Sequence, residues 1–407
     1  MRIFSIFFHP DRKITFLGGA EKRFLRFLKF LCNGEFKVKV LVLEPEPRLL
    51  NRESDSFRVF SLSKPFKVDS SSLLLDYLSW ILWSFKAAVF SIPIFVREKP
   101  DLILSPNNTL PNILPAFLIK LLFRKPLYIV VHHFDITSHE KENFSLAKFV
   151  KNYRKIGYSF SASFFKALAF ILAISLLKKA DKFISVSEFT ARWLQELGAK
   201  RKDILVSGNG VDLEKISIFC QNLHSKVFDG VFVGRISSEK GIYSLVNAWR
   251  IVVSRWQGAR LAIVGEGPEL ETLKKKIQDL KLERNVMVFG GLPDEEMYKV
   301  LSRSKIFIFP SLFEGWGLAV AEALACGLPV VCYEIPALKE VFGECKSVFF
   351  VSQFNSKVLA EKVLRILESF DAEKFRETSR RFVRKFDWEK IFLKELNFLQ
   401  RSLKEIG

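Results

Sequence analysis

Short runs of apolar residues alternate with longer amphipathic stretches along most of the chain. Examples of the runs are RIFSIFF at 2–8, KVKVLVL at 37–43 and LYIVV at 127–131, which are typical of buried parallel strands. The stretches between them repeat their apolar residues at helical intervals. This alternation predicts a parallel α/β sheet covered by helices.

The stretch 305–333 shows the pattern most clearly. KIFIFPS predicts the end of a buried strand, Glu314 lies in the following loop, a helix is expected from about Gly317, and PVVCY predicts the next strand. The end of such a strand and the start of such a helix normally face a ligand crevice. Glu314 and Glu322 are about two helical turns apart, so both are expected to point towards one bound molecule.

The same loop and helix contain two kinds of binding group. The backbone amides at Gly317 and Leu318 lie at a positive helix end that suits a phosphate, whereas carboxylates suit hydroxyls. Phosphate with several hydroxyls describes a nucleotide sugar. The bare E-x7-E pattern is, however, more often a helix cap followed by a solvated helix residue.

The complete string FEGWGLAVAEALACGLPVV at 313–331 resembles the donor-binding segment of the retaining glycosyltransferases of family 4. Both glutamates of the family's E-x7-E motif are matched, by Glu314 and Glu322. The resemblance implies the GT-B fold, in which two Rossmann-like, doubly wound parallel-sheet domains face each other across a cleft. It also implies that Glu314 holds the donor sugar and Glu322 the ribose.

Two cations follow the predicted strand VFDGVFV. Arg235 and Lys240 lie five residues apart in a loop before a helix, where they are suited to neutralise a diphosphate, although a surface charge pair is the alternative. GRISSEKG is similar to the family's diphosphate signature. After the next predicted strand, Glu266 and Gly267 form a turn that is expected beside the nucleotide base, as the family's counterpart is.

The first half of the chain matches the family more loosely. Gly18 and Gly19 precede a helix whose basic residues, including Arg23, are expected on a cationic side; the glycines form a turn or, as the resemblance of GGAE implies, face the donor phosphates. His132 and His133 end a predicted strand. Either is a structural histidine or, as the resemblance implies, one contacts the donor sugar, with His132 favoured.

Two helix caps are also predicted. Ser185 and Glu188 have the spacing of a capping box, and Asp294 precedes an acidic helix start.

The chain of 407 residues is long enough for two domains, each with its own core. We expect an amino-terminal, acceptor-side domain at 1–210, a nucleotide-sugar-binding domain at 211–385, and a last helix at about 386–407 that packs back on the first domain. The five cysteines show no C-x-x-C pair, which favours reduced structural thiols over a zinc site or a disulfide framework.

The formal charge of +19 and the many phenylalanines favour an anionic partner surface, or alternatively a biased genome composition. Nucleic acid is disfavoured because the sequence contains no nucleic-acid-binding motif. The apolar helix at 73–97 and the basic, aromatic segment 141–179 are each interrupted by charges, so we expect core helices or contact with an anionic membrane surface. The amino terminus is too short in apolar residues for a secretory signal, which predicts a cytoplasmic, peripheral location.

Together these features predict a glycosyltransferase of the hexosyltransferase type, which moves a sugar from a UDP or GDP sugar to a glycan or lipid-linked acceptor. Sequence and resemblance assign Glu314 with His132 or His133 to the sugar, and Glu322, Glu266 and Gly267 to ribose and base. Retention of configuration is implied by the resemblance, and neither metal nor cofactor is expected because no D-x-D ends a predicted strand. The alternatives are a nucleotide-sugar 2-epimerase and a non-catalytic nucleotide-sugar-binding or membrane-associated subunit.

Overall fold

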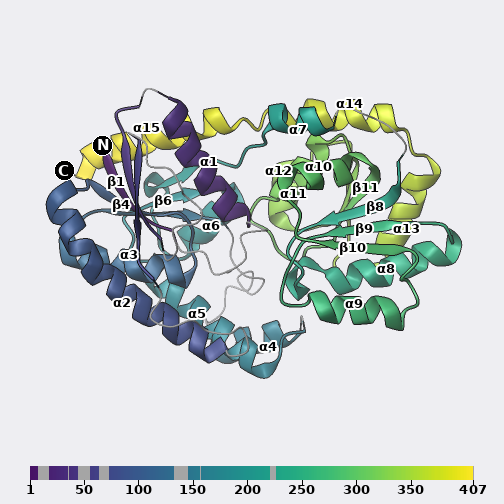
Figure 1. Ribbon diagram of the computed structural model, residues 1–407, viewed down its shortest axis with the longest axis horizontal. Coiled ribbons are helices and arrows are strands. Elements are labelled where there is room, and N and C mark those ends of the chain that lie inside the picture. Colours follow the sequence, from purple (N-terminus) through teal and green to yellow (C-terminus); the bar gives the residue numbers. More distant parts are fainter. Residues whose placement is uncertain are drawn as a thin grey trace. The chain divides into compact units, whose positions relative to one another are not determined.

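The computed structural model describes residues 1–7, 18–34, 36–44, 56–63, 73–132, 145–155, 157–220 and 226–406. These residues form two compact units (Figure 1). Unit 1 contains Gly19–Gly208 together with the amino-terminal strand and the chain from Glu389 onward, and unit 2 contains Asn209–Trp388.

Unit 1 is built on a parallel sheet. The described part of this sheet has seven strands in the order β3-β2-β1-β4-β5-β6-β7. On β1, Phe4 is in register with Leu41 of β2 and with Ile103 of β4. The strands are β1 (Arg2–Ile6), β2 (Lys39–Glu44), β3 (Phe57–Ser61), β4 (Leu102–Ser105), β5 (Leu127–Val131), β6 (Lys182–Ser185) and β7 (Ile204–Val206).

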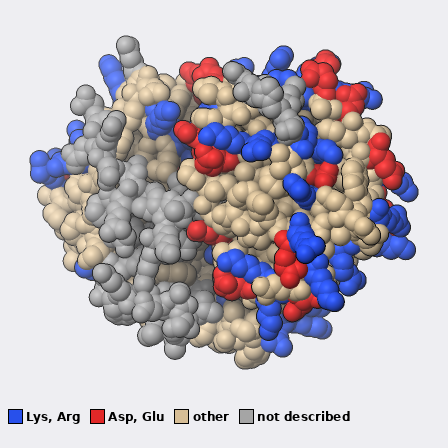
Figure 2. Space-filling view, turned by 45° about the vertical axis from the view of Figure 1, so that its right-hand side comes forward, with Lys and Arg blue, Asp and Glu red and all other residues tan. Residues whose placement is uncertain are grey.

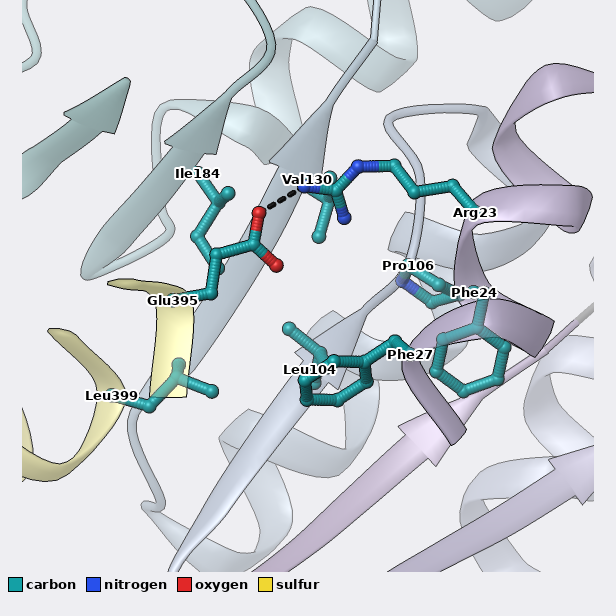
Figure 3. A pocket seen from close by; sticks show the side chains of 9 residues that line it. All are labelled: Arg23, Phe24, Phe27, Leu104, Pro106, Val130, Ile184, Glu395 and Leu399. Carbon is teal, nitrogen blue, oxygen red and sulfur yellow. Dashed lines mark hydrogen bonds and ion pairs between the residues drawn. The ribbon is translucent and has the colours of Figure 1, made fainter. Parts of the chain in front are cut away.

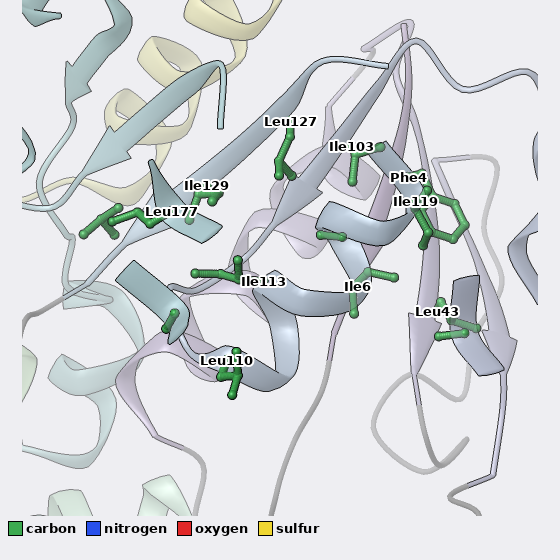
Figure 4. Close-up of a cluster of buried hydrophobic side chains, with 14 of the residues drawn as sticks. Phe4, Ile6, Leu43, Ile103, Leu110, Ile113, Ile119, Leu127, Ile129 and Leu177 are labelled. Atoms are coloured by element: carbon green, nitrogen blue, oxygen red, sulfur yellow. The ribbon is translucent and has the colours of Figure 1, made fainter. Parts of the chain in front are cut away.

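Helices cover both faces of this sheet. Those of unit 1 are α1 (Gly19–Asn33), α2 (Leu73–Glu98), α3 (Leu110–Phe123), α4 (Leu146–Lys155), α5 (Phe160–Leu177), α6 (Glu188–Glu196) and most of α15 (Trp388–Ile406). Helices α2, α3 and α5 lie on one face, and α1 and α15 on the other (Figure 1). Between α3 and the strands lies an apolar core that includes Ile113, Ile119, Ile103 and Ile129 (Figure 4).

The prediction that Arg23 contributes to a cationic side of the first helix was wrong. Arg23 is 3% exposed and forms an ion pair with Glu395 of α15, beside a small cavity lined by Phe24, Phe27 and other residues (Figure 3). Its guanidinium also lies 5.7 Å from the ring centroid of Phe392. The reason is tertiary: α15 covers this side of α1, and a buried charge needs a partner.

The predicted Ser185 and Glu188 capping box was also wrong by two residues. Ser187 is the N-cap of α6, and its hydroxyl accepts a hydrogen bond of 3.1 Å from the backbone N–H of Thr190. Ser185 still belongs to β6, and its hydroxyl donates to the Ser187 carbonyl oxygen. Glu188 is the first helical residue and pairs with Arg201 at 3.0 Å.

Unit 2 is a second parallel sheet with helices on both faces (Figure 1), so the predicted α/β class of parallel sheets is confirmed. Its described strands follow the order β10-β9-β8-β11-β12-β13. They are β8 (Phe228–Val233), β9 (Leu261–Val264), β10 (Val286–Gly290), β11 (Ser304–Phe309), β12 (Val330–Tyr333) and β13 (Val348–Val351).

The helices of unit 2 lie before, between and after these strands in the chain. They are α7 (Leu213–Phe219), the short 3-10 helix η3 (Ser238–Lys240), α8 (Ile242–Arg255), α9 (Leu270–Asp279), α10 (Asp294–Ser302), α11 (Leu318–Ala325), α12 (Pro336–Phe342), α13 (Ser356–Glu368) and α14 (Ala372–Val383). The prediction that Asp294 caps α10 was wrong. Pro293 occupies that position, and Asp294 instead pairs with Lys215 at 3.0 Å.

Candidate functional site

The candidate site lies at the carboxyl ends of two neighbouring strands of unit 2. Strand β8 pairs with β9 on one side and with β11 on the other, so the chain changes direction across the sheet between β8 and β11. In open parallel sheets such a switch point is where ligands bind. The loop after β8 contains Arg235 and Lys240, and the loop after β11 contains Glu314.

The loops at this edge pack backbone against backbone. Gly241 has φ 69°, and a Cβ at this position would overlap the carbonyl oxygen of Pro310. The backbone N–H of Leu312 donates to the Glu239 carbonyl oxygen at 2.9 Å. Gly265 has φ 145°, and a Cβ there would overlap the carbonyl oxygen of Gly234. Glycine is therefore required where the loops after β9 and β11 approach the loop after β8.

The structure brings Lys240 and Glu314 together, as the sequence predicted for their two motifs. Lys240 Nζ donates to Glu314 Oε1, and the Ser311 hydroxyl donates to the same oxygen at 2.9 Å. The side chains are 24% and 14% exposed. Lys240 Nζ also lies 5.9 Å from the ring centroid of Phe309. The contacts with Ser311 and Phe309 therefore hold the ion pair in place, while both side chains remain accessible to a ligand.

The amino-terminal end of α11 follows directly. Gly317 is its N-cap with φ 98°, and Leu318 is its first residue. A side chain at position 317 would collide with Leu338 and crowd Phe342 of α12. The glycine thus lets the helix start close to α12, four residues after Glu314, and orients the amides of its first turn.

Glu322 lies in the second turn of α11 and is partly buried. Its Oε1 accepts a hydrogen bond of 3.3 Å from the hydroxyl of Tyr298 on α10. This tyrosine is fully buried, so it fixes one oxygen of the carboxylate from the protein side.

The predicted base-side turn also lies against the loop after β8. The Glu266 carbonyl oxygen accepts from the N–H of Ile236 at 2.8 Å, and a Cβ at Gly267 would overlap the Ile236 carbonyl oxygen. Arg235 is exposed, and within the described ranges no ion pair or hydrogen bond occupies its side chain. The roles proposed for Arg235, Glu266 and Gly267 stay predictions.

The predicted residues of the first half occupy the following positions. Gly18 immediately precedes α1, and Gly19 is the first residue of that helix. His132 follows β5, is 8% exposed, and has Nε2 3.0 Å from the Pro106 carbonyl oxygen. Because a carbonyl only accepts, this contact places the proton on Nε2. His133 lies outside the described residues, and contact of either histidine with a sugar stays a prediction.

Sequence reasoning missed two residues that organise the carboxylates. Ser311 lies three residues before Glu314, and this spacing is a local signal because serine hydroxyls commonly bond to nearby groups. Tyr298 lies 24 positions before Glu322 on a different helix. No pattern in a single sequence connects these two positions.

Solved structures share this architecture over the whole chain. Sucrose-phosphate synthase from Thermosynechococcus elongatus superposes with a TM-score of 0.75 and 19% identity, covering 100% of both chains. Anabaena Alr3699/HepE, solved in complex with UDP-glucose, has a TM-score of 0.69 and 19% identity, covering 98% of this chain and 100% of its own. The fold is therefore GT-B, as predicted.

Family models identify the particular group. The model of Glycosyltransferase Family 4 matches residues 17–215, and that of Glycosyl transferases group 1 matches residues 217–382. The chain belongs to family 4 of the glycosyltransferases, which confirms the predicted resemblance.

Curated relatives match part of the chain. The putative colanic acid biosynthesis glycosyltransferase WcaL of Escherichia coli (strain K12) is 28% identical over 46% of this chain and 48% of its own length. The poly(glycerol-phosphate) alpha-glucosyltransferase of Bacillus subtilis (strain 168) is 30% identical over 40% of this chain and 24% of its own length. The chain thus spans about half or less of the length of these relatives.

Proposed function

We propose that the chain transfers a sugar, with retention of configuration, from a nucleoside diphosphate sugar of the UDP or GDP type to a glycan or lipid-linked acceptor. The observation that carries the proposal is the contact between Lys240 and Glu314 at the switch point of the sheet of unit 2. It places a cation for phosphate and a carboxylate for sugar hydroxyls side by side.

The diphosphate is the leaving group, and its growing negative charge needs stabilisation. Arg235 and Lys240 supply two cations from the loop after β8, and the amino terminus of α11 at Gly317 and Leu318 supplies amide dipoles. Donors fixed in this way stabilise charge without reorganisation and are worth a few kcal/mol each, about 3 in known cases. Because these groups supply the positive charge, we assign no metal ion to the diphosphate. Gly18 and Gly19 are assigned to the same diphosphate from the amino-terminal half.

The ion pair has an electrostatic role before the donor binds. Glu314 and a diphosphate are both negative, so they repel each other unless a cation lies near both. Lys240 already neutralises Glu314 and has further N–H donors for a phosphate oxygen. Glu314 can then accept hydrogen bonds from the hydroxyls of the sugar without repelling the diphosphate.

The remaining roles follow the same division between charge and hydroxyls. Glu322, oriented by Tyr298, binds the ribose hydroxyls, and the turn at Glu266 and Gly267 lies beside the base. We assign the sugar contact of the amino-terminal half to His132 or His133. No protein nucleophile is assigned: in this proposal the departing phosphate takes the acceptor's proton.

The comparisons support the substrate class. Anabaena Alr3699/HepE was solved with UDP-glucose, and Staphylococcus aureus TarM with UDP and α-GlcNAc-glycerol. The relatives described above are named for colanic acid biosynthesis and for poly(glycerol-phosphate) glucosylation. A nucleotide-sugar donor and a glycan or polymer acceptor are consistent with these bound molecules and names.

The decisive experiment compares the Lys240–Glu314 pair, which joins the loops after β8 and β11, with an ion pair that joins these two strands directly. Lys305 on β11 pairs with Asp229 on β8 at 2.7 Å, with side chains 25% and 12% exposed, so it matches Lys240 and Glu314 in kind and burial. Asp229 and Lys305 lie near the amino-terminal ends of their strands, at the opposite edge of the sheet.

Transfer and slow hydrolysis of a panel of labelled UDP and GDP sugars would be measured for Lys240→Met, Glu314→Gln, Lys305→Met and Asp229→Asn. We expect the first two to lower turnover at least about a hundredfold and the control pair to change it less than about threefold. Equal losses in both pairs, or full activity in Glu314→Gln, would refute the site. Donor binding without turnover in the unaltered chain would favour the binding subunit, and formation of an epimeric nucleotide sugar would favour the epimerase.

We further propose that unit 1 rests on an anionic membrane surface, where a lipid-linked acceptor would be presented. Helix α2 has an outward stripe of exposed apolar residues spaced by three and four: Leu78, Leu82, Phe85, Val89, Ile92 and Val96. Its inward positions include the fully buried Trp83 and Ala87. A helix on the surface of a globular domain normally has polar residues on its outward side.

Neighbouring helices extend this apolar surface. Leu121 and Leu122 of α3 and Phe160, Leu168 and Leu172 of α5 are exposed, and α3 packs against both α2 and α5. The segments Leu78–Glu98 and Phe160–Leu177 are long and apolar enough to cross a membrane by length and composition, and less than half of each is buried. Their inner faces pack in unit 1, which favours lying on a membrane rather than crossing it.

Positive charge borders the patch. Lys151, Arg154 and Lys155 are exposed on α4, which packs against α5. In contrast, the face drawn in Figure 2 shows basic and acidic side chains interspersed among neutral ones. Apolar side chains beside cations are the combination that binds anionic lipid headgroups.

Co-sedimentation with phosphatidylglycerol-containing and pure phosphatidylcholine vesicles tests this surface. We expect salt-sensitive binding to the anionic vesicles only, weakened about tenfold by Phe85→Ser or Val89→Ser. Met287→Ser and Phe354→Ser are the controls, because these exposed apolar residues lie in unit 2. Absence of binding to the anionic vesicles would refute the membrane proposal. A dimer in lipid-free solution that the α2 variants dissociate would identify a second copy as the partner instead.

A further inference from the structure

Two cysteines of unit 2 form a contact that the proposed reaction does not use. Cys220 is the C-cap of α7, and Cys326 is the C-cap of α11, the helix that contains Glu322. Their Sγ atoms are 3.0 Å apart, and the residues are 3% and 7% exposed. Both are free thiols in this structure. A disulfide requires an S–S distance of about 2.05 Å, so the two sulfurs are already close to bonding distance.

Cationic side chains surround this pair. Arg380 donates from Nη2 to the Cys220 carbonyl oxygen at 3.2 Å and from Nε to the Ala325 carbonyl oxygen at 3.1 Å. The hydrogen bond shared with Cys326 lowers the pKa of Cys220, against the effect of burial and with help from Arg380 and Lys226. Burial, followed by the bond to Cys220, raises the pKa of Cys326. The pair therefore resembles a nucleophilic thiolate beside a resolving thiol.

The pair is also connected to the predicted ribose carboxylate. The backbone N–H of Cys326 donates to the carbonyl oxygen of Glu322 at 3.0 Å. On the other side, the Cys220 sulfur lies 3.7 Å from the carbonyl oxygen of Tyr298, whose hydroxyl donates to Glu322. Drawing the sulfurs together would thus displace both elements that hold this carboxylate.

We propose that Cys220 and Cys326 are a reversible dithiol site, oxidised by peroxide to a disulfide whose formation weakens nucleotide-sugar binding at Glu322. The Cys220 thiolate attacks one oxygen of the peroxide, the O–O bond breaks, and hydroxide leaves, which forms a sulfenic acid. The Cys326 sulfur then attacks the Cys220 sulfur, the S–O bond breaks, and the leaving hydroxide takes the thiol proton as water. The hydroxide from the first step takes up the proton that Cys220 lost when its thiolate formed, so both sulfurs are oxidised and the peroxide is reduced to two waters.

Burial restricts the oxidant and the competing thiols. With so little surface exposed, only a small oxidant such as hydrogen peroxide reaches the sulfurs. Cys32 is exposed, and Cys332 is buried with its pKa raised chiefly by burial; within the described residues neither has a sulfur contact with another cysteine. These two cysteines are therefore suitable internal controls.

The test begins with hydrogen peroxide treatment of the full chain, followed by peptide mapping and intact mass. We expect a Cys220 to Cys326 linkage and a loss of about 2 Da, both reversed by dithiothreitol. The linkage should persist in Cys32→Ser and Cys332→Ser, and it should be absent in Cys220→Ser and Cys326→Ser, with thermal melting to check folding. Five unchanged thiols, or linkage through Cys32, would overturn the proposal.

The second measurement is calorimetric binding of a UDP or GDP sugar to reduced and oxidised chain, and it rests on the proposed function. We expect about fivefold or greater weakening on oxidation, absent in Cys220→Ser. A disulfide that leaves donor affinity unchanged would overturn the coupling to Glu322. If the reduced chain binds no nucleotide sugar, the proposed function fails, whereas peptide mapping still decides whether the dithiol site exists.

Discussion

The Tyr298 hydroxyl donates to Oε1 of Glu322 across 3.3 Å, so a fully buried residue of α10 orients the carboxylate assigned to the ribose. Glu322→Gln should raise the Kd for the nucleotide sugar about tenfold, because hydrogen bonds to a charged group contribute about 1.5–3 kcal/mol. Turnover at saturating donor should change little.

A deoxyribose analogue of the donor separates this effect from misfolding. It should bind less tightly than the natural donor to the unaltered chain, but equally well to Glu322→Gln. An equal penalty in both proteins would show that Glu322 does not contact the ribose hydroxyls.

Gly241 tests the packing of the loops at the sheet edge. Gly241→Ala should lower the free energy of unfolding by more than about 2 kcal/mol, because its φ of 69° is strained for alanine and the new Cβ would overlap the Pro310 carbonyl oxygen. Gly258→Ala, where no atom lies within 4 Å of the added Cβ, should change stability by less than about 1 kcal/mol. Urea denaturation measures both, and similar values would contradict the packing described.

The buried ion pair of unit 1 predicts a cost for removing one partner. Glu395→Ala should destabilise the chain by about 3–5 kcal/mol, because Arg23 would keep a buried charge without its carboxylate. Replacing both residues with Leu should recover much of that loss. The exposed pair Arg381 and Glu377 is the control, and Glu377→Ala should change stability by less than about 1 kcal/mol.

The raised pKa of Tyr243 predicts that the free energy of unfolding falls at alkaline pH. Burial, followed by a hydrogen bond with Glu269, raises its pKa from 10.0 to about 12. Because the folded pKa exceeds the unfolded one, this contribution is complete below pH 10 and is lost as the pH rises from 10 to 12. The difference in unfolding free energy between the unaltered chain and Tyr243→Phe should therefore shrink over this interval. A constant difference would show that Tyr243 does not titrate as described.

The parallel architecture was predictable because buried strands are almost wholly apolar and end at glycine-containing turns. The proximity of Lys240 and Glu314 was predictable for the same reason: each follows the carboxyl end of a strand, and β8 and β11 are neighbours. Helix α3 carries two prolines and is apolar on all sides, so its residues show no helical period that would identify it.

Contacts between distant residues account for the failures. The sequence indicates a surface position for Arg23 because its partner Glu395 is 372 positions away. Cys220 and Cys326 are separated by 106 positions, and nothing in their local sequence indicates a shared contact. At α6, two serines, Ser185 and Ser187, are candidates for the cap position, and only the end of β6 decides between them.

The glycine contacts at the edge of the second sheet also bear on how enzymes of this architecture diversify. At Gly241 and Gly265 the main chains of three loops pack directly against each other, so these contacts do not depend on the side chains that project from the loops. Exchange of exposed neighbours that are not assigned to the diphosphate would then retune donor choice while the scaffold keeps its shape. An engineer seeking a new sugar preference should randomise those projecting positions and leave the glycines untouched.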